Sequence, residues 1–273
     1  MSEPVEITFH SGPPRIGQVT LFTSEEETRL LFTGTRVNDG ARVRSVSTSR
    51  SRRVRREEII AARGKVAQRV RVAFIEDVTT TDTDGKKGRS VGPFAGSTFE
   101  IERKDDHADL SVYDTSGAPV RLGIAAQIAG LYRDFGREGA PPVKLPAGPQ
   151  RIGQSAPELA ESMAAGIAVG ASLSKVESPQ ATLAEIRPGQ NGALHGLYRV
   201  SLKVSGESSG SLVALDLTGT ILLRDVDSVP LEVRLQGPLR STPPDPAAGA
   251  PPGTIPGAAG EFKMTQTMVY ARA

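Results

Sequence analysis

The chain has 273 residues and a net charge of +2, and 38% of its residues are hydrophobic. It contains no cysteine and no tryptophan, which excludes disulfide frameworks, thiolate metal sites, cysteine nucleophiles and most aromatic cages. No stretch reaches the roughly 18 apolar residues that would cross a bilayer as a helix. Its 29 glycines and 20 prolines supply many turns. We therefore expect a single β-rich domain over residues 1–273, since all-β domains often exceed about 200 residues.

Alternation of apolar and polar residues, which is typical of half-buried strands, begins at Val5, Ile7 and Phe9. A basic block follows, because residues 42–72 hold ten Arg and one Lys against two Glu, a local surplus of nine positive charges. Residues 42–56 have few side chains to bury, which predicts an exposed or edge strand protected by charge. Five arginines share strand parity and would project from one face: Arg42, Arg44, Arg50, Arg52 and Arg56.

Two interpretations of the basic block stay open. Its arginines either meet an anionic membrane or protein surface, or they balance acidic residues elsewhere in the fold and guard an edge strand. Nucleic acid is disfavoured as a partner, because residues 42–72 contain no aromatic side chain on which bases would stack.

The polar segment 76–93 contains Asp82-Thr-Asp84-Gly85-Lys86, which begins like a calcium loop. A lysine holds the fifth position and no glutamate closes a twelve-residue loop, so the segment predicts a hairpin turn instead. Short strands are expected at residues 97–103 and 108–113. The tip between them carries Asp105, Asp106, His107 and Asp109, which we interpret as a solvated turn and not as a metal site.

Helical spacing occurs in two places. Apolar residues at i, i+4, i+7 and i+11 mark the first helix, namely Ile124, Ile128, Leu131 and Phe135. Gly136 is placed to end it. The second helix is expected over the Ala-rich residues 156–171, with Pro157 in its first turn.

The last ninety residues alternate most regularly and predict an antiparallel meander with one apolar face. Residues 241–260 hold little that can be buried, so we expect a mobile loop within the domain. A sheet of about eleven strands presents more apolar surface than two short helices cover, so it closes on itself or leaves a cavity. The candidate ligand-lining residues are Tyr198, Leu202, Leu215, Leu217, Leu235, Phe262 and Met268, with ordinary core packing as the alternative for each.

Matches to catalytic motifs are incomplete. Gly206-Glu-Ser-Ser-Gly210 fits a nucleophile elbow, but a strand follows it and no histidine comes after His195. The Ser-x-x-Lys pattern from Ser172 to Lys175 lacks its companion triplets. We therefore expect no catalytic site, no metal site and no cofactor.

Two stretches resemble a known family. Residues 92–101 read Gly-Pro-Phe-Ala-Gly-Ser-Thr-Phe-Glu-Ile, and residues 112–120 read Val-Tyr-Asp-Thr-Ser-Gly-Ala-Pro-Val. Together they resemble the Gly-x-x-aromatic-x-apolar and Asp-Gly-x-Val hairpin of uncharacterised bacterial envelope lipoproteins. Residues 145–155 are similar to the Pro-x-x-Pro-Val-x-x-Gly-Asp-x-Trp element of that family, although Gln154 stands in place of Asp and no Trp follows.

The resemblance implies a relation to the half-barrels of the outer-membrane lipoprotein-carrier superfamily. In these a curved antiparallel sheet wraps one or two helices and a cavity that holds acyl chains. The expected fold class is accordingly mainly β: a large curved antiparallel sheet, or half-barrel, with one or two helices packed on its concave face.

Two functional hypotheses follow. The first is a non-enzymatic bacterial cell-envelope protein that binds a lipid or other apolar ligand in a half-barrel cavity. The second is a structural or scaffolding β-protein that docks through its Arg-rich face on an anionic protein or membrane surface. No leader precedes the first strand pattern. We therefore expect either an envelope location, in the periplasm or at the outer-membrane periphery after removal of a leader, or a cytoplasmic one.

Overall fold

The computed structural model describes residues 6–10, 12–35, 42–64, 66–105, 109–137, 144–170, 173–189, 192–208, 211–226, 230–242 and 258–271. Its strands are β1 (Glu6–Ile7), β2 (Val19–Thr35), β3 (Arg42–Arg63), β4 (Val66–Thr83), β5 (Lys86–Val91), β6 (Thr98–Glu102), β7 (Ser111–Tyr113), β8 (Gln150–Arg151), β9 (Lys175–Pro188), β10 (Leu194–Ser208), β11 (Ser211–Arg224), β12 (Pro230–Thr242) and β13 (Ala258–Ala271). Its helices are α1 (Leu122–Leu131) and α2 (Pro157–Gly170). No helix among the described residues is long and apolar enough to span a membrane.

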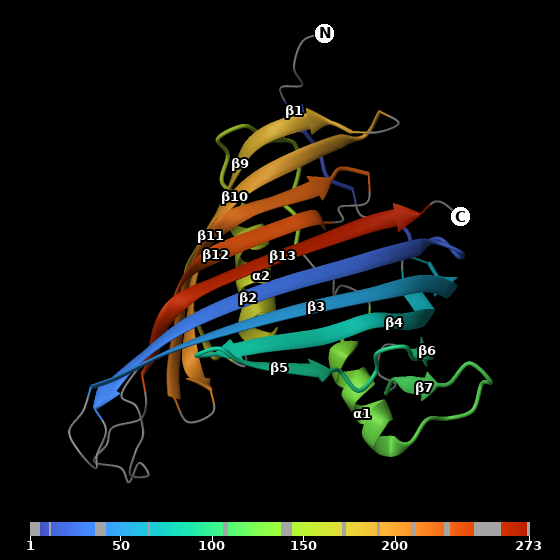
Figure 1. The fold of residues 1–273 in the computed structure, drawn as a ribbon. Coiled ribbons are helices and arrows are strands. Elements are labelled where there is room, and N and C mark those ends of the chain that lie inside the picture. The colour runs from blue at the N-terminus through green and yellow to red at the C-terminus, as the bar shows by residue number, and fades with distance from the viewer. Residues whose placement is uncertain are drawn as a thin grey trace.

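Eleven strands form one antiparallel sheet in the order β7-β6-β4-β3-β2-β13-β12-β11-β10-β9, with β5 paired to β4 (Figure 1). The last strand, β13, pairs with β2 in the middle of the sheet and so joins the two ends of the chain. The sheet is not closed into a barrel, and β1 and β8 form a small sheet of their own. The expected fold class, a large curved antiparallel sheet with helices on its concave face, is confirmed.

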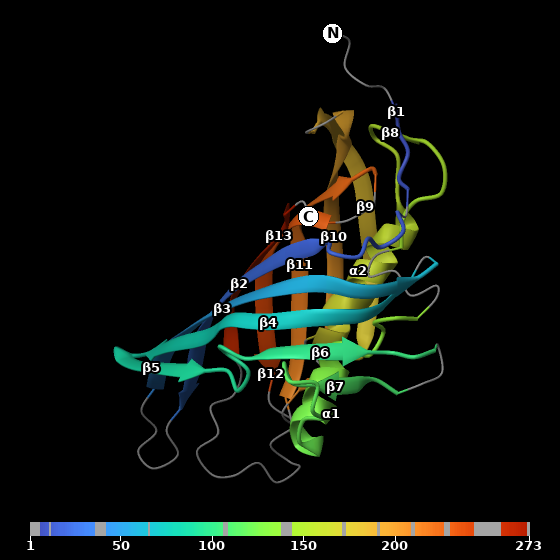
Figure 2. The same cartoon turned by 90° about the vertical axis from the view of Figure 1, so that its right-hand side faces the viewer.

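Both helices pack on one face of the sheet, called the inner face here (Figure 2). Helix α2 packs on β9 and β10 and buries Leu159, Ala160, Ala164 and Ala168 in one cluster with residues of β9 to β12, which is called the α2 core. Helix α1 buries Ile128 against β4, β6 and β7, in a separate cluster called the α1 core. The two cores therefore lie at opposite sides of one face, and β13, β2 and β3 run between them.

Irregular pairing and glycines bend the sheet. Ile75 of β4 is an extra residue between the pairs Arg55–Phe74 and Val54–Glu76, and it is 54% exposed. Such a bulge bends its strand and increases the local twist. On the inner face, a Cβ atom at Gly219 would lie 1.9 Å from the backbone oxygen of Arg234, and one at Gly237 equally close to that of Asp216. These close backbone approaches exclude any side chain there.

Several expectations about local structure are corrected. β3 is not an edge strand, because β2 and β4 pair with it on either side. Ser241 is paired with Ala258, so both ends of the expected loop 241–260 belong to strands, and residues 243–257 lie outside the described part. Helix α1 ends at Leu131 and not near Gly136.

The turn between β4 and β5 is a two-residue hairpin, as predicted. Thr83 pairs with Lys86, and the two residues between them, Asp84 (φ 50°) and Gly85 (φ 83°), are both left-handed. This is the conformation that an Asp-Gly pair favours. The hairpin therefore accounts for the segment that begins like a calcium loop.

The packing of Leu217 allows a direct test of the α2 core. We predict that Leu217→Ala lowers the free energy of unfolding by about 2–5 kcal/mol, because this fully buried side chain leaves a cavity when truncated. Leu212→Ala on the same strand is the control, since Leu212 is 61% exposed and should change stability by no more than about 0.5 kcal/mol. Urea unfolding of both variants measures this, and equal effects would contradict a filled core.

Candidate functional site

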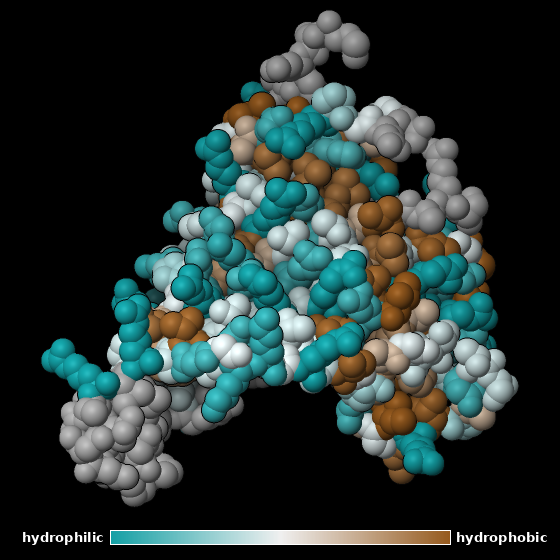
Figure 3. Space-filling view, in the orientation of Figure 1, coloured by the Kyte–Doolittle hydropathy of each residue, from teal (hydrophilic) through white to brown (hydrophobic). Residues whose placement is uncertain are grey.

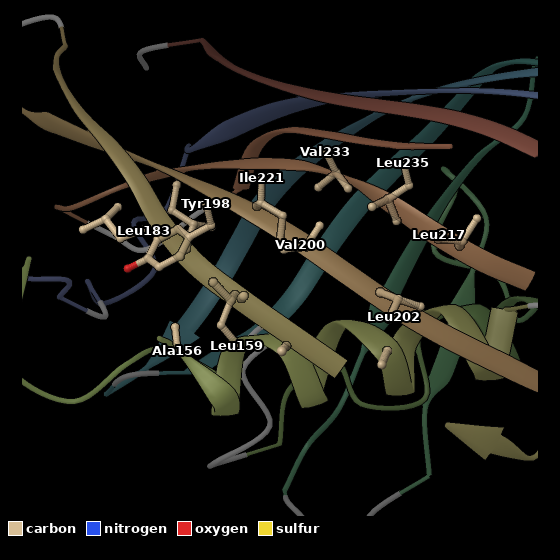
Figure 4. Close-up of a cluster of buried hydrophobic side chains, with 14 of the residues drawn as sticks. Ala156, Leu159, Leu183, Tyr198, Val200, Leu202, Leu217, Ile221, Val233 and Leu235 are labelled. Atoms are coloured by element: carbon tan, nitrogen blue, oxygen red, sulfur yellow. The ribbon is translucent and has the colours of Figure 1, made fainter. Parts of the chain in front are cut away.

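Five of the seven candidate ligand-lining residues lie inside the α2 core (Figure 4). They lie on β10, β11 and β12, are at most 5% exposed and belong to the same buried cluster as the helix residues: Tyr198, Leu202, Leu215, Leu217 and Leu235. Burial raises the pKa of the Tyr198 hydroxyl, so this group stays neutral. These positions have the environment of core residues, and the helix occupies the space in front of them.

The other two candidates, Phe262 and Met268, lie beyond the α2 core on the inner face of β13. Apolar residues of β2 lie beside this part of β13 on the same face, because Met268 is paired with Phe22 and Gly260 with Leu30. All the apolar side chains of this region are half-buried. We call them the inner strip: Phe262, Met264 and Met268 of β13, with Phe22, Leu30 and Phe32 of β2.

Short hydroxyl side chains border the inner strip. On β3, the inner face carries only serines over four consecutive inward positions: Ser45, Ser47, Ser49 and Ser51. The Ser47 and Thr83 hydroxyls are 2.9 Å apart across β3 and β4. Within β2, the Ser24 hydroxyl is buried and has no hydrogen-bond partner among the described residues. The inner face therefore changes from apolar to hydroxyl-bearing between β13 and β3.

Charged side chains lie at the end of this hydroxyl-bearing region that is nearer to α1. Arg53 lies 3.6 Å from Glu26 and 3.5 Å from Asp77, on the strands at either side. One guanidinium against two carboxylates leaves a net charge of −1 on these three side chains, so the inner face carries no surplus of positive charge at this level. The region is consequently suited to a neutral or zwitterionic polar group more than to a free ion.

A second polar cluster ties α1 to the middle of the sheet. The Tyr132 hydroxyl donates to Glu57 Oε1 at 2.6 Å, and Arg55 Nε donates to the same oxygen at 2.7 Å. The Arg55 guanidinium also lies 4.5 Å above the Phe22 ring, within the range of a cation–π contact. Burial and the neighbouring carboxylate raise the pKa of Tyr132, so it remains a hydrogen-bond donor.

The arginines predicted to share one face do so, on the outer face. Arg50 lies 3.2 Å from Glu27, and Arg52 lies 3.2 Å from Glu25 on β2. Arg52 also contacts Glu76 of β4, and Arg56 lies 3.1 Å from Glu58. By contrast, Arg42 and Arg44 have no ion-pair partner in the described part of the chain.

Neighbouring strands balance most of the basic block. Six carboxylates from outside residues 42–72 lie within 4 Å of its arginines: Glu25, Glu26, Glu27, Glu76, Asp77 and Glu100. Nine positive charges less these six leave a surplus of three. This arrangement matches the interpretation in which the arginines balance acidic residues elsewhere in the fold.

The short motifs add no site to the described residues. Gly206 lies at the end of β10, which pairs with β11 through Ser208 and Ser211, so the elbow-like pattern belongs to a hairpin. No group of three or more potential metal ligands occurs among the described residues. Residues 106–108 of the Asp105 to Asp109 tip, and Ser172 of the Ser-x-x-Lys pattern, lie outside the described part.

Most of the inner strip was not predicted from the sequence. Met264 belonged to a recognised alternating strand, but Phe22, Leu30 and Phe32 are separated by the acidic run at residues 25–27. Period-two spacing from Phe22 to Phe32 was the available signal, since all three positions have the same parity. That β2 lies beside β13 could not be seen, because these strands come from opposite ends of the chain.

Comparisons with known proteins identify no family. No family model and no curated protein match the sequence. A solved structure of lipovitellin, described as showing lipid–protein interactions, is similar with a TM-score of 0.35 and 5% identity, over 94% of this chain and 25% of that one. An outer membrane channel from Pseudomonas putida F1 gives a TM-score of 0.23 and 9% identity, over 94% and 97%. The chain spans a quarter of the lipovitellin chain, and at these TM-scores neither likeness carries an argument.

Glu100 provides a pH-dependent test of the charge pairing. It is 8% exposed and accepts hydrogen bonds from Arg71, at 2.7 Å, and it also contacts Arg69. The hydrogen bond from Arg71, which outweighs the opposing effect of burial, holds the pKa of Glu100 below its ordinary value of 4.5. A carboxyl whose pKa is lower in the folded state adds stability above its unfolded pKa and loses it as the pH falls through the folded value.

We therefore predict that Glu100→Gln lowers the free energy of unfolding by roughly 1–3 kcal/mol at neutral pH. The difference from wild type should shrink as the pH falls below about 4.5. Glu102→Gln is the control, since Glu102 lies on the same strand and face without an ion-pair partner in the described chain. Urea unfolding at several pH values measures both, and a difference that does not depend on pH would contradict the assignment.

Proposed function

We propose that this chain is a non-enzymatic cell-envelope protein that binds a lipid or similar amphiphile along its inner strip. The observation that carries the proposal is the row of half-buried apolar side chains on β13 and β2, outside the helix-filled part of the α2 core. Phe262 and Met264 pack against the edge of that core, so the strip extends its apolar surface. The proposed binding position therefore keeps Phe262 and Met268 of the seven candidate lining residues and leaves out the five that lie in the α2 core.

The dimensions of the strip suit an acyl chain. Phe22 and Phe32 are ten residues apart on β2, which corresponds to roughly 33 Å at about 3.3 Å per residue. One leaflet of a bilayer needs about half of the ~30 Å hydrocarbon core. Ser24, Glu26 and Thr28 separate Phe22 from Leu30 on the inner face of β2, so an extended chain would follow the β13 side of the strip, from Phe262 to Met268.

The polar border supplies groups for the other end of an amphiphile. The buried Ser24 hydroxyl has no partner among the described residues, and a buried polar group without a hydrogen bond costs free energy. The serines of β3 lie beside the strip and offer further donors and acceptors. A ligand with an apolar chain and a neutral polar group would satisfy both sides.

The resemblance to envelope lipoproteins agrees with this proposal. In that superfamily the curved sheet holds acyl chains, and the architecture of this chain is of the same general kind. The envelope location and the absence of enzymatic activity belong to the proposal and rest on this resemblance, since fold alone does not fix function.

Met264→Lys tests the binding site. Met264 lies on the inner strip across from Glu26, so a lysine there would have a carboxylate nearby and the fold should be kept. We expect this variant to weaken binding of a fluorescent fatty-acid probe by about tenfold or more, because an ammonium group displaces apolar contact. Thr265→Lys is the matched control, since it faces Glu25 on the outer face and should bind like wild type.

Native mass spectrometry of the wild-type protein completes the test, with co-purified adducts expected in the mass range of lipids. Thermal unfolding of both lysine variants checks that they are folded. A wild type that neither carries an adduct nor binds the probe would refute the proposal, as would equal losses in the two variants.

A further inference from the structure

A groove on the outer face is formed by β3, β4 and β5, away from the inner strip. Its volume is about 470 Å³, and it is lined by Thr48, Arg50, Thr80, Thr81, Asp82, Lys87, Gly88 and Arg89. Figure 3 shows the outer face, where hydrophilic side chains predominate over these strands. Pockets for small ligands commonly measure about 300–1,000 Å³, so the groove is large enough for one polar group and its attachment.

The register explains why three cations gather there. Thr80 of β4 is paired with Arg50 on one side and with Arg89 on the other, and Asp82 is paired with Lys87. Side chains directly across neighbouring strands project to the same face. Arg50, Lys87 and Arg89 therefore lie on the outer face within two residue positions of one another.

Two of these three cations, Lys87 and Arg89, differ from the paired arginines of β3. Lys87 and Arg89 have no ion-pair partner within the described ranges, whereas Arg52 and Arg56 are paired. The Arg50 guanidinium lies 3.2 Å from the Glu27 carboxylate, and the Arg50 side chain is 66% exposed. The groove thus keeps much of the positive charge that ion pairs remove elsewhere on β3.

The single carboxylate of the groove is partly engaged. Asp82 Oδ1 accepts a hydrogen bond from the Gly85 backbone N–H at 2.9 Å, within the β4–β5 turn. Three cations against one carboxylate leave a net charge of +2 among the lining residues. The hydroxyls of Thr48 and Thr80 add neutral groups on the same face as these charges, whereas Thr81 is paired with the inward Ser49.

We propose that this groove binds a phosphate monoester group, either of a free phosphate compound or of an anionic lipid headgroup. The net charge of +2 on the lining residues, of which Arg50 is also paired with Glu27 outside the groove, favours an anionic phosphate. Its oxygens accept charge-assisted hydrogen bonds from guanidinium and ammonium groups, and hydroxyls complete such sites. The site does not depend on the inner strip, which lies on the opposite face.

The test is calorimetric titration of the full chain with inorganic pyrophosphate and with glycerol phosphate, together with flotation on vesicles. One vesicle set contains phosphatidic acid in phosphatidylcholine, and the other contains phosphatidylcholine alone. We expect Lys87→Gln/Arg89→Gln to weaken phosphate binding by roughly tenfold or more, since two charge-assisted contacts are lost. Binding should also weaken from low salt to about 0.15 M salt, because the cations are exposed.

Two controls separate a built site from general attraction. Lys86→Gln removes a cation next to Lys87 but on the opposite face, where it is paired with Thr83. Lys203→Gln/Lys263→Gln removes two outer-face charges on β10 and β13, which matches the net charge of the groove double variant. Both controls should keep affinity within about twofold of wild type.

The vesicle arms identify the source of the phosphate. Flotation with phosphatidic acid that the groove variant abolishes indicates a lipid headgroup, whereas binding of the soluble compounds alone indicates a free phosphate. Equal losses in the groove variant and the charge-matched control would overturn the proposal, as would absence of binding to any phosphate probe at low salt. Failure here leaves fatty-acid binding at Met264 unaffected, so the two proposals fail separately.

Discussion

The continuity of one sheet between two separate apolar cores is the constraint on which the rest of the structure depends. The α2 core and the α1 core lie on the same face, and β2 and β3 must join them with few fully buried side chains of their own. The two strands are paired along the whole of β2, from Val19–Glu58 to Thr35–Arg42. Cross-strand ion pairs such as Arg52–Glu25 contribute only about 0–1 kcal/mol each when exposed, but they let charged strands occupy the centre of a sheet.

This constraint divides the chemistry of the molecule by face. Because the two helices fill only the sides of the inner face, its middle is left with half-buried apolar side chains beside serines. The same strands present charges on the outer face, where most are neutralised by neighbours. The β4–β5 hairpin adds Lys87 and Arg89 at a place where carboxylates are few, which makes the outer groove basic.

The candidate site shows what the alternation of apolar and polar residues along a strand can predict and what it cannot. It correctly placed Leu202, Leu217 and Leu235 on one face, because parity alone decides the side to which a strand residue points. It could not decide between a cavity and a filled core, since that depends on where α2 packs. The expected edge position of residues 42–56 was wrong because a lack of apolar side chains is equally compatible with ion pairing to Glu25–Glu27 and Glu76.

The sequence by itself determined the mainly antiparallel β-fold, the two helices, the Asp84–Gly85 hairpin and the shared face of Arg42, Arg44, Arg50, Arg52 and Arg56, since these follow from local spacing and turn chemistry. Only the tertiary structure decided which strands are neighbours. The pairing of β13 with β2 creates the inner strip, and the pairing of β5 with β4 creates the outer groove. Such pairings join distant segments, and no local pattern specifies them because loop closure and packing over the whole sheet select the partner.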